Sequence, residues 1–166
     1  MFEREMQALR QRIFDLVTSC EYDKAQQVCD DAIVNVPTSE RHRVLGWLGY
    51  VEWSRGNRDS AIEIVRHACR AQPLSPAHMS TLAHWLFERG RFEEAISSAK
   101  SLIEIEKDRA LPAFRNSALF IAAHSALKLG RAGEAREWAV KIDDGQSERL
   151  GGRICSKSSL LELLQE

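Results

Sequence analysis

Ser97 and Lys100 have the Ser-x-x-Lys spacing of a nucleophile and its base. Such a pair can carry out acyl transfer when a strained turn presents the serine and backbone N–H groups stabilise the oxyanion. Here both residues lie in the alanine-rich run EEAISSAKSLIEIE, whose pattern predicts a helix with neither feature. The sequence also contains no GxSxG, HExxH or Walker-type glycine loop. We therefore expect a protein that is not an enzyme and that needs no cofactor.

Histidine and cysteine side chains could instead hold a metal ion, but their spacing argues against it. The four cysteines form no CxxC pair and no Cys/His cluster with zinc-like spacing. Reduced thiols and a cytoplasmic location are therefore expected. His84 and His124 could form a metal pair or a switch near neutral pH if they faced each other across a groove. The other interpretation, which we favour, is two polar groups that line a surface, so no metal site is predicted.

The charge balance and the lack of long apolar runs exclude two classes of partner. The 166 residues include 23 Lys and Arg against 24 Asp and Glu, so no basic field would attract nucleic acid or an anionic membrane. The longest apolar runs are only a few residues, and the N-terminal MFEREMQALRQR lacks the apolar core of a secretory signal. The predicted partner is a protein or peptide, with neither nucleic acid nor membrane involved.

A short pattern recurs along the chain and organises it into helix pairs. It reads GNRDSAIEIV, GRFEEAISSA and GRAGEAREWA, with a weaker copy CEYDKAQQVC near the start. The alanines that follow the turn in each copy are 36, 34 and 40 residues apart: Ala25, Ala61, Ala95 and Ala135. A repeat of this period is typical of stacked helical units. We found no alternation of apolar and polar residues long enough to predict a strand.

The pattern resembles the tetratricopeptide repeat, whose consensus is W-x2-L-G-x2-Y…A-x3-F…P. In the second unit, Leu48-Gly49, Ala61, Val65 and Pro73 fill the consensus positions. The third unit matches well, and the first and fourth match more loosely. The resemblance implies an all-α, right-handed superhelix of about four helix pairs in a single domain, residues 1–166. The expected repeats and tail are 6–39, 42–75, 76–109, 110–149, and a loop with a capping helix over 150–166.

Glycines and other small residues have a steric role in this scheme. Gly49 and its counterparts Ala83 and Ala123 lie where the two helices of a unit approach each other. Gly56 and its counterparts Gly90 and Gly130 end the first helix of each pair, because glycine adopts the left-handed conformation at low cost.

Two segments depart from the repeat. The insertion ALPAFR, residues 110–115, is expected to lengthen the first helix of the fourth unit, with Pro112 in its first turn. In the tail, Gly151-Gly152 predicts a loop, and Ser159 with Glu162 predicts a capping box before a leucine-rich helix. That helix would cover the last repeat, because the open end of a solenoid exposes core.

The resemblance also implies where a partner binds, since the first helices of the pairs build the inner wall of such a superhelix. The wall positions carried over as partner-binding residues are Arg10, Phe14, Arg43, Trp47, Tyr50, Trp53, His84, Phe87, Phe120, His124 and Lys128. Aromatic side chains are frequent anchors of binding surfaces. The alternative is that several of these rings pack in the core.

The wall positions also exclude one kind of ligand. Chaperone-associated members of the family hold a C-terminal carboxylate with a Lys/Asn/Arg clamp, but the asparagine positions here hold Phe14, Tyr50, His84 and His124. We therefore expect an apolar or amphipathic segment on an aromatic groove, held by an adaptor or chaperone. Size and repeat content resemble the bacterial type III secretion chaperones. Three alternatives stay open: an immunity-like or antitoxin-like inhibitor of a toxin or enzyme, an enzyme, and a homo-oligomer whose groove or open end holds a second copy.

Overall fold

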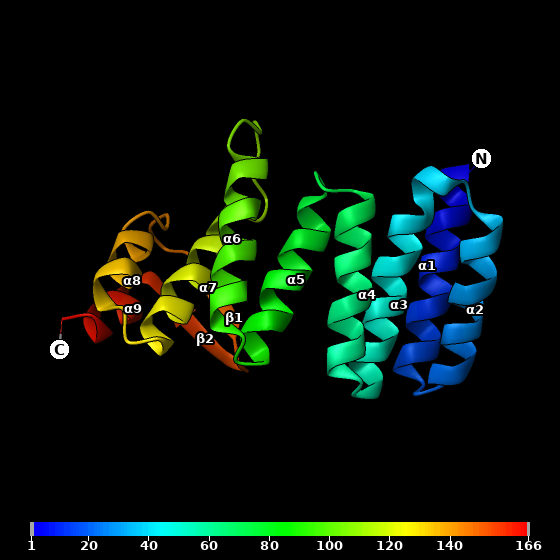
Figure 1. The fold of residues 1–166 in the computed structure, drawn as a ribbon, viewed down its shortest axis with the longest axis horizontal. Helices are drawn as coiled ribbons and strands as arrows, with labels where there is room; N and C mark the ends of the chain where they lie inside the picture. Colours follow the sequence, from blue (N-terminus) through cyan, green and yellow to red (C-terminus); the bar gives the residue numbers. More distant parts are fainter. Residues whose placement is uncertain (1, 166) are drawn as a thin grey trace. The chain divides into compact units, whose positions relative to one another are not determined.

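The computed structural model describes residues 2–165, and over these residues the chain is helical apart from one short hairpin (Figure 1). The chain divides into two compact units, one that ends at Pro73 and one that begins at Leu74. The division lies two residues before the predicted start of the third repeat at residue 76. The expected all-α fold of paired helices is confirmed.

The first unit consists of two helix pairs. Its elements are α1 (Phe2–Thr18), α2 (Tyr22–Asn35), a 3-10 turn η1 (Thr38–Glu40), α3 (Arg41–Arg55) and α4 (Arg58–Ala71). α1 packs against α2, α2 against α3 and α3 against α4. Buried side chains from several helices, among them Ile13, Cys29 and Val44, form its core.

The second unit contains two further pairs and the C-terminal elements. These are α5 (Pro76–Glu88), α6 (Phe92–Glu106), α7 (Arg115–Lys128), α8 (Ala132–Ala139), β1 (Ser147–Leu150), β2 (Arg153–Ser156) and α9 (Lys157–Leu163). α7 lies at the centre of this unit, because it packs against α5, α6, α8 and β1. Ser75 is the N-cap of α5, because its side chain accepts a hydrogen bond from the His78 N–H.

The first helix of every pair ends in the same hydrogen-bonded motif. In the second pair the Gly56 N–H donates to the Trp53 carbonyl at 3.1 Å, and the Asn57 N–H donates to the Glu52 carbonyl at 2.9 Å. The same two bonds recur in the other three pairs, centred on Cys20, Gly90 and Gly130. The four central residues have φ of +58° at Cys20, +102° at Gly56, +72° at Gly90 and +73° at Gly130. This is the Schellman motif, which requires a left-handed residue, so the predicted role of the glycines is confirmed.

The small residues of the repeat lie where the helices meet. The four repeat alanines are fully buried: Ala25, Ala61, Ala95 and Ala135. Gly49, Ala83 and Ala123 are also buried, on the first helices α3, α5 and α7. A larger side chain at such positions would separate the helices, which explains the small residue types.

The insertion is a loop and does not lengthen a helix, so that prediction is wrong. α6 ends at Glu106 and α7 begins only at Arg115, which leaves Pro112 between the helices. The Glu106 carboxylate, only 1% exposed, accepts a hydrogen bond from the Phe114 N–H at 2.7 Å and closes this loop. The residue before a proline also disfavours helical geometry.

The tail forms a β-hairpin that the sequence analysis did not predict. β1 and β2 pair antiparallel, with Leu150 opposite Arg153. Gly151 and Gly152 have φ of +55° and +78°, which fits a two-residue turn between strands. The glycine pair was therefore predicted correctly as a turn, but its flanks are strands.

α9 covers part of the second unit as expected, although its first residue differs from the prediction. The capping box consists of Ser156 and Ser159, each of which bonds the other's backbone N–H at 3.1 Å, and Glu162 has no part in it. Leu160 and Leu164 are buried, and α9 contacts α8.

Candidate binding surface

Two aromatic rings from different helices stack on the first unit. Phe14 of α1 and Tyr50 of α3 have ring centroids 4.6 Å apart and planes inclined by 11°. Both residues lie eleven positions before a repeat alanine, on the first helix of their pairs. Both are only partly buried, so the stack is part of the surface.

Arginines accompany these rings at a spacing of one helical turn. The Arg10 guanidinium lies 5.1 Å from the centroid of the Phe14 ring, and that of Arg43 lies 6.0 Å from the Trp47 ring. Residues four apart on a helix are neighbours, so the sequence itself sets these two contacts. Each cation–π contact contributes on the order of 0.5–1 kcal/mol at an exposed position.

The two arginines differ in electrostatic environment. Arg43 binds both carboxylate oxygens of Glu3 at 2.9 Å and also contacts Glu40 at 3.1 Å. The hydrogen bond to Arg43 lowers the pKa of Glu3 and raises that of Arg43. Arg43 is therefore neutralised and ties α1 to α3. Arg10 has no carboxylate partner within residues 2–165, so it is the cation that this face offers to a ligand.

We call Arg10, Phe14, Arg43, Trp47 and Tyr50 the aromatic face. Trp47 and Tyr50 pack on one side against the buried cluster of the first unit while part of each ring stays exposed. These two rings are therefore held in place by the core, and their own side chains would lose little entropy on contact with a ligand. The aromatic face thus combines partly exposed rings with one cation, Arg10, that has no carboxylate partner in the described chain.

Trp53 is also only partly buried, but a cation from the next helix already lies over its ring. The Arg58 guanidinium of α4 is 4.1 Å from the ring centroid. The indole of Trp53 thus belongs to the contact between α3 and α4, and we leave it out of the aromatic face.

Two predicted binding rings of the second unit lie in its core, which corrects the sequence-based assignment. Phe120 is fully buried and Phe87 is 8% exposed. Helices or strands pack on several sides of α7, which encloses Phe120. Phe87 makes an edge-on contact with Phe92, with centroids 5.6 Å apart. Neither ring is available to a partner.

The hairpin lies on the first helices of the second unit. β1 contacts both α5 and α7, and Leu150 is buried there. The His84 Nε2 donates a hydrogen bond to the Arg149 carbonyl oxygen at 2.9 Å. The chain's own strand thus contacts the side of α5 and α7 where the family resemblance places a ligand.

The other predicted residues of this unit do not form a metal site. Burial lowers the pKa of His124, and Lys128 adds a smaller effect in the same direction. His124 Nε2 is buried without a hydrogen-bond partner within the described residues. Lys128 is exposed near the end of α7. No cluster of three His, Cys, Asp or Glu side chains suited to a metal ion occurs between residues 2 and 165.

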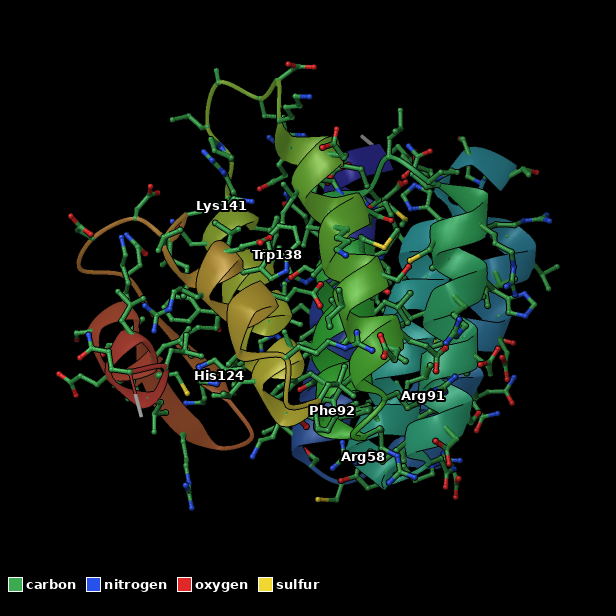
Figure 2. All side chains as sticks on the ribbon, turned by 60° about the vertical axis from the view of Figure 1, so that its left-hand side comes forward. Arg58, Arg91, Phe92, His124, Trp138 and Lys141 are labelled. Atoms are coloured by element: carbon green, nitrogen blue, oxygen red, sulfur yellow. The ribbon has the colours of Figure 1, made fainter. Side chains whose placement is uncertain are left out.

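One partly exposed tryptophan was missed by the sequence analysis. Trp138 of α8 has the Lys141 ammonium 4.5 Å from its ring centroid (Figure 2). The Lys100 ammonium lies 5.5 Å from the same centroid. The position of Lys141, three residues after the ring on the chain, was a signal for the nearer contact. The contact of Lys100 with Trp138 could not be predicted from spacing, because Lys100 lies on a different helix, α6.

The Ser97-x-x-Lys100 pair lacks the surroundings of a catalytic site. Both residues are exposed on α6, and the Lys100 ammonium contacts Glu134 at 3.4 Å and the Trp138 ring. The Ser97 carbonyl accepts a hydrogen bond from the Ser101 hydroxyl, as is usual within a helix.

Across the described part of the chain, no helix is long and apolar enough to cross a membrane.

Comparisons with known proteins agree with the repeat architecture. The sequence profile of the tetratricopeptide repeat matches residues 116–141, which cover most of α7 and all of α8. This match falls in the fourth repeat, where the consensus is less evident by eye than in the second. A search of curated proteins finds no match.

Solved structures with helical repeats superpose on most of the chain. TPR-like repeats from Podosopora anserina give a TM-score of 0.68 at 16% identity, over 82% of this chain and 72% of that one. A tetratricopeptide repeat protein from Parabacteroides merdae gives 0.68 at 17% identity, over 82% and 51%. The Yersinia enterocolitica type III secretion chaperone SycD, in complex with a peptide of the translocator YopD, gives 0.62 at 20% identity, over 76% and 95%. The resemblance to tetratricopeptide repeats is therefore confirmed at the level of the fold.

Proposed function

We propose that this chain is a noncatalytic protein-interaction module that holds an apolar or amphipathic protein segment on the aromatic face of its first unit. The observation that carries the proposal is the stacked pair Phe14 and Tyr50, with Trp47 beside the pair on α3. Rings that are half-exposed yet fixed by a core are the usual anchors of peptide recognition. The SycD structure supports the proposal, because it shows a chain of similar fold in complex with a peptide.

The charge of the aromatic face defines the segment further. Arg43 is already paired with Glu3 and Glu40, so it adds little to ligand binding. Arg10 lies over the Phe14 ring and has no carboxylate of its own in the described chain. A segment with aliphatic or aromatic residues next to an Asp or Glu would bury its apolar side chains on the rings and pair its carboxylate with Arg10.

A cytoplasmic location goes with this proposal. All four cysteines are free, and burial raises the pKa of the thiol to about 12 at Cys29 and to about 11 at Cys69. Thiols that stay protonated and unpaired fit a reducing compartment.

A library of random peptides displayed for selection against the whole chain tests the proposal without a known partner. We expect the selected peptides to combine apolar residues with an acidic one. Phe14→Ala should weaken their binding about 30-fold, the effect of losing an anchor worth about 2 kcal/mol. Arg10→Glu should weaken the binding of acidic peptides and spare neutral ones.

Trp138→Ala is the matched control, because Trp138 is also a partly exposed ring beside cations but lies outside the aromatic face. Thermal melts of all variants separate a loss of binding from a loss of folding. Selected peptides that bind the Phe14 variant as tightly as the parent chain would refute the proposal. So would a selection without binders, or a Phe14 variant that unfolds.

A further inference from the structure

The outer side of α1 carries a stripe of residues that face away from the aromatic face. Phe2, Glu5, Leu9, Arg12 and Leu16 are spaced three, four, three and four apart. This spacing places them along one side of a helix, as in the contact seam of two paired helices. Phe14 lies on a different side of the helix, where it stacks on α3. The two surfaces of α1 are therefore separate.

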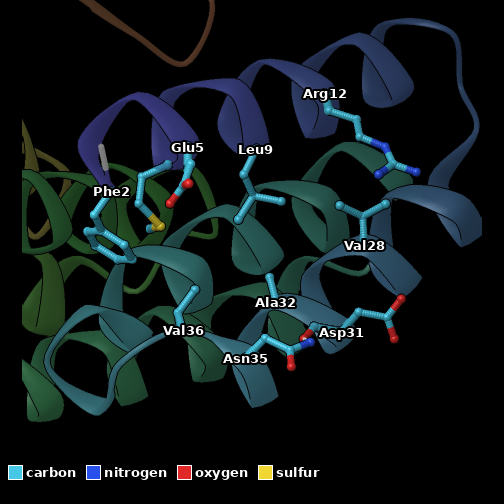
Figure 3. Close-up of a pocket in the computed structure, with 10 residues that line it drawn as sticks. Phe2, Glu5, Leu9, Arg12, Val28, Asp31, Ala32, Asn35 and Val36 are labelled. Atoms are coloured by element: carbon cyan, nitrogen blue, oxygen red, sulfur yellow. The ribbon is translucent and has the colours of Figure 1, made fainter.

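A pocket of about 380 Å³ runs along this stripe between α1 and α2 (Figure 3). Apolar side chains of both helices form part of its lining, including Leu9 of α1 and Val28 and Ala32 of α2. Phe2 and Glu5 line one end of the stripe, and Arg12 extends over the α2 side at the other end. The middle of the pocket is thus apolar, Glu5 lies toward one end, and Arg12 and Asp31 lie toward the other.

Glu5 and Arg12 are exposed and have no ionic partner among the described residues. They are seven residues apart, so each lies about 5 Å along the helix axis from a midpoint next to Leu9. Phe2 and Leu16 lie farther out, again on either side of Leu9. The stripe therefore has opposite charges, and apolar groups beyond them, placed symmetrically about one leucine.

We propose that this stripe and the pocket beside it form a two-fold interface with a second copy of the chain. When a second α1 runs antiparallel across Leu9, Glu5 of each copy faces Arg12 of the other. Phe2 of each copy then faces Leu16 of the other. Every charge in the stripe meets its complement, and the Glu5–Arg12 pair forms twice across the interface, which is the property of a surface that binds itself.

Two consequences distinguish this interface from the proposed peptide site. The interface uses a side of α1 that leaves Phe14 and Tyr50 exposed, so a dimer presents two aromatic faces. Its existence does not depend on the peptide proposal, because the stripe and the aromatic face share no residue. Each proposal can fail while the other stands.

Charge reversal tests the interface with the whole chain, using light scattering after size-exclusion chromatography over a range of concentrations. The parent chain should approach twice its mass of 18.8 kDa as concentration rises. Glu5→Arg or Arg12→Glu alone should raise the dimer dissociation constant tenfold or more, because like charges then face each other twice. The double variant Glu5→Arg with Arg12→Glu should restore the dimer.

Arg4→Glu is the control, since Arg4 is an exposed arginine of α1 outside the stripe. Circular dichroism should show all variants folded, because exposed substitutions change stability by only about 0.5 kcal/mol. A parent chain that stays monomeric at every concentration overturns the proposal. A double variant that fails to recover the dimer, or an Arg4→Glu effect as large as that of Arg12→Glu, also overturns it.

Discussion

Cys20 is the one non-glycine residue between residues 2 and 165 with a positive φ, and replacing it with glycine should stabilise the first unit. Its φ of +58° strains an L-residue by about 1–2 kcal/mol. Glycine removes this strain but costs about 0.5–1 kcal/mol in extra unfolded-state entropy. The Tyr22 hydroxyl also loses its contact with the Cys20 sulfur at 3.6 Å, which is exposed and weak. The expected net gain for Cys20→Gly is about 0.5–1 kcal/mol.

Gly56→Ala is the matched reverse change in the same motif. Gly56 has φ of +102°, and a Cβ built there meets no atom within 4 Å. Alanine would therefore introduce backbone strain without a steric clash. We expect it to lower the free energy of unfolding by about 1 kcal/mol or more.

Urea denaturation followed by circular dichroism measures both changes, and hydrogen exchange assigns each to a helix pair. This second measurement is needed because both turns lie in the first unit, whose helix pairs can open locally with different free energies. Protection should rise in α1 and α2 for Cys20→Gly and fall in α3 and α4 for Gly56→Ala. A Cys20→Gly variant that loses stability, with Gly56→Ala unchanged, would refute the assignment of the turn strain.

Three further predictions follow from burial and charge. Because the Arg43 contact lowers the pKa of Glu3, its stabilising effect is complete above the ordinary carboxyl pKa and is lost as pH falls through the lowered folded-state value. Glu3→Gln should therefore flatten the acid side of a stability curve measured by urea titration at several pH values. Phe120→Ala should lower the free energy of unfolding by about 3–5 kcal/mol in the same assay, because the ring is fully buried. Since burial raises the pKa of Cys29 to about 12, iodoacetamide under mildly alkaline conditions should alkylate the exposed Cys20 but not Cys29 until urea unfolds the chain, as peptide mass spectrometry would show.

The register of the helix pairs could be predicted because it rests on local steric requirements. A left-handed residue must end the first helix, and only glycine fits that position without strain, as at Gly56 and Gly130. A small residue must lie where two helices cross, as Ala61 and Ala95 do. Both requirements leave a mark on residue type at a fixed period, so the sequence alone reveals them.

The hairpin and the loop before α7 could not be predicted because tertiary contacts determine them. Strands of four residues such as SERL and RICS carry little signal of their own. Their pairing is accompanied by burial of Leu150 and by contacts of β1 with α5 and α7. The loop likewise depends on Glu106, whose buried carboxylate bonds a backbone N–H eight residues away.

The exposure of individual site residues was also beyond the sequence pattern. Arg10 and Phe120 both lie fifteen residues before a repeat alanine, on the first helices of the first and fourth pairs. Arg10 is exposed, whereas Phe120 is fully enclosed. The repeat fixes the direction of each side chain along its own helix, but neighbouring elements decide whether solvent reaches it.

One position of the repeat holds different residue types in the two units. The residues eleven before each repeat alanine are Phe14 and Tyr50 in the first unit and His84 and His124 in the second, and all four are half-buried. A histidine can donate a hydrogen bond to a backbone carbonyl, and His84 does so to Arg149 of the chain's own strand. The Phe14 ring has no hydrogen-bond donor for a carbonyl, and it stacks on the Tyr50 ring instead. At this repeat position, therefore, His84 of the second unit bonds the protein's own hairpin, whereas the first unit has two stacked aromatic rings.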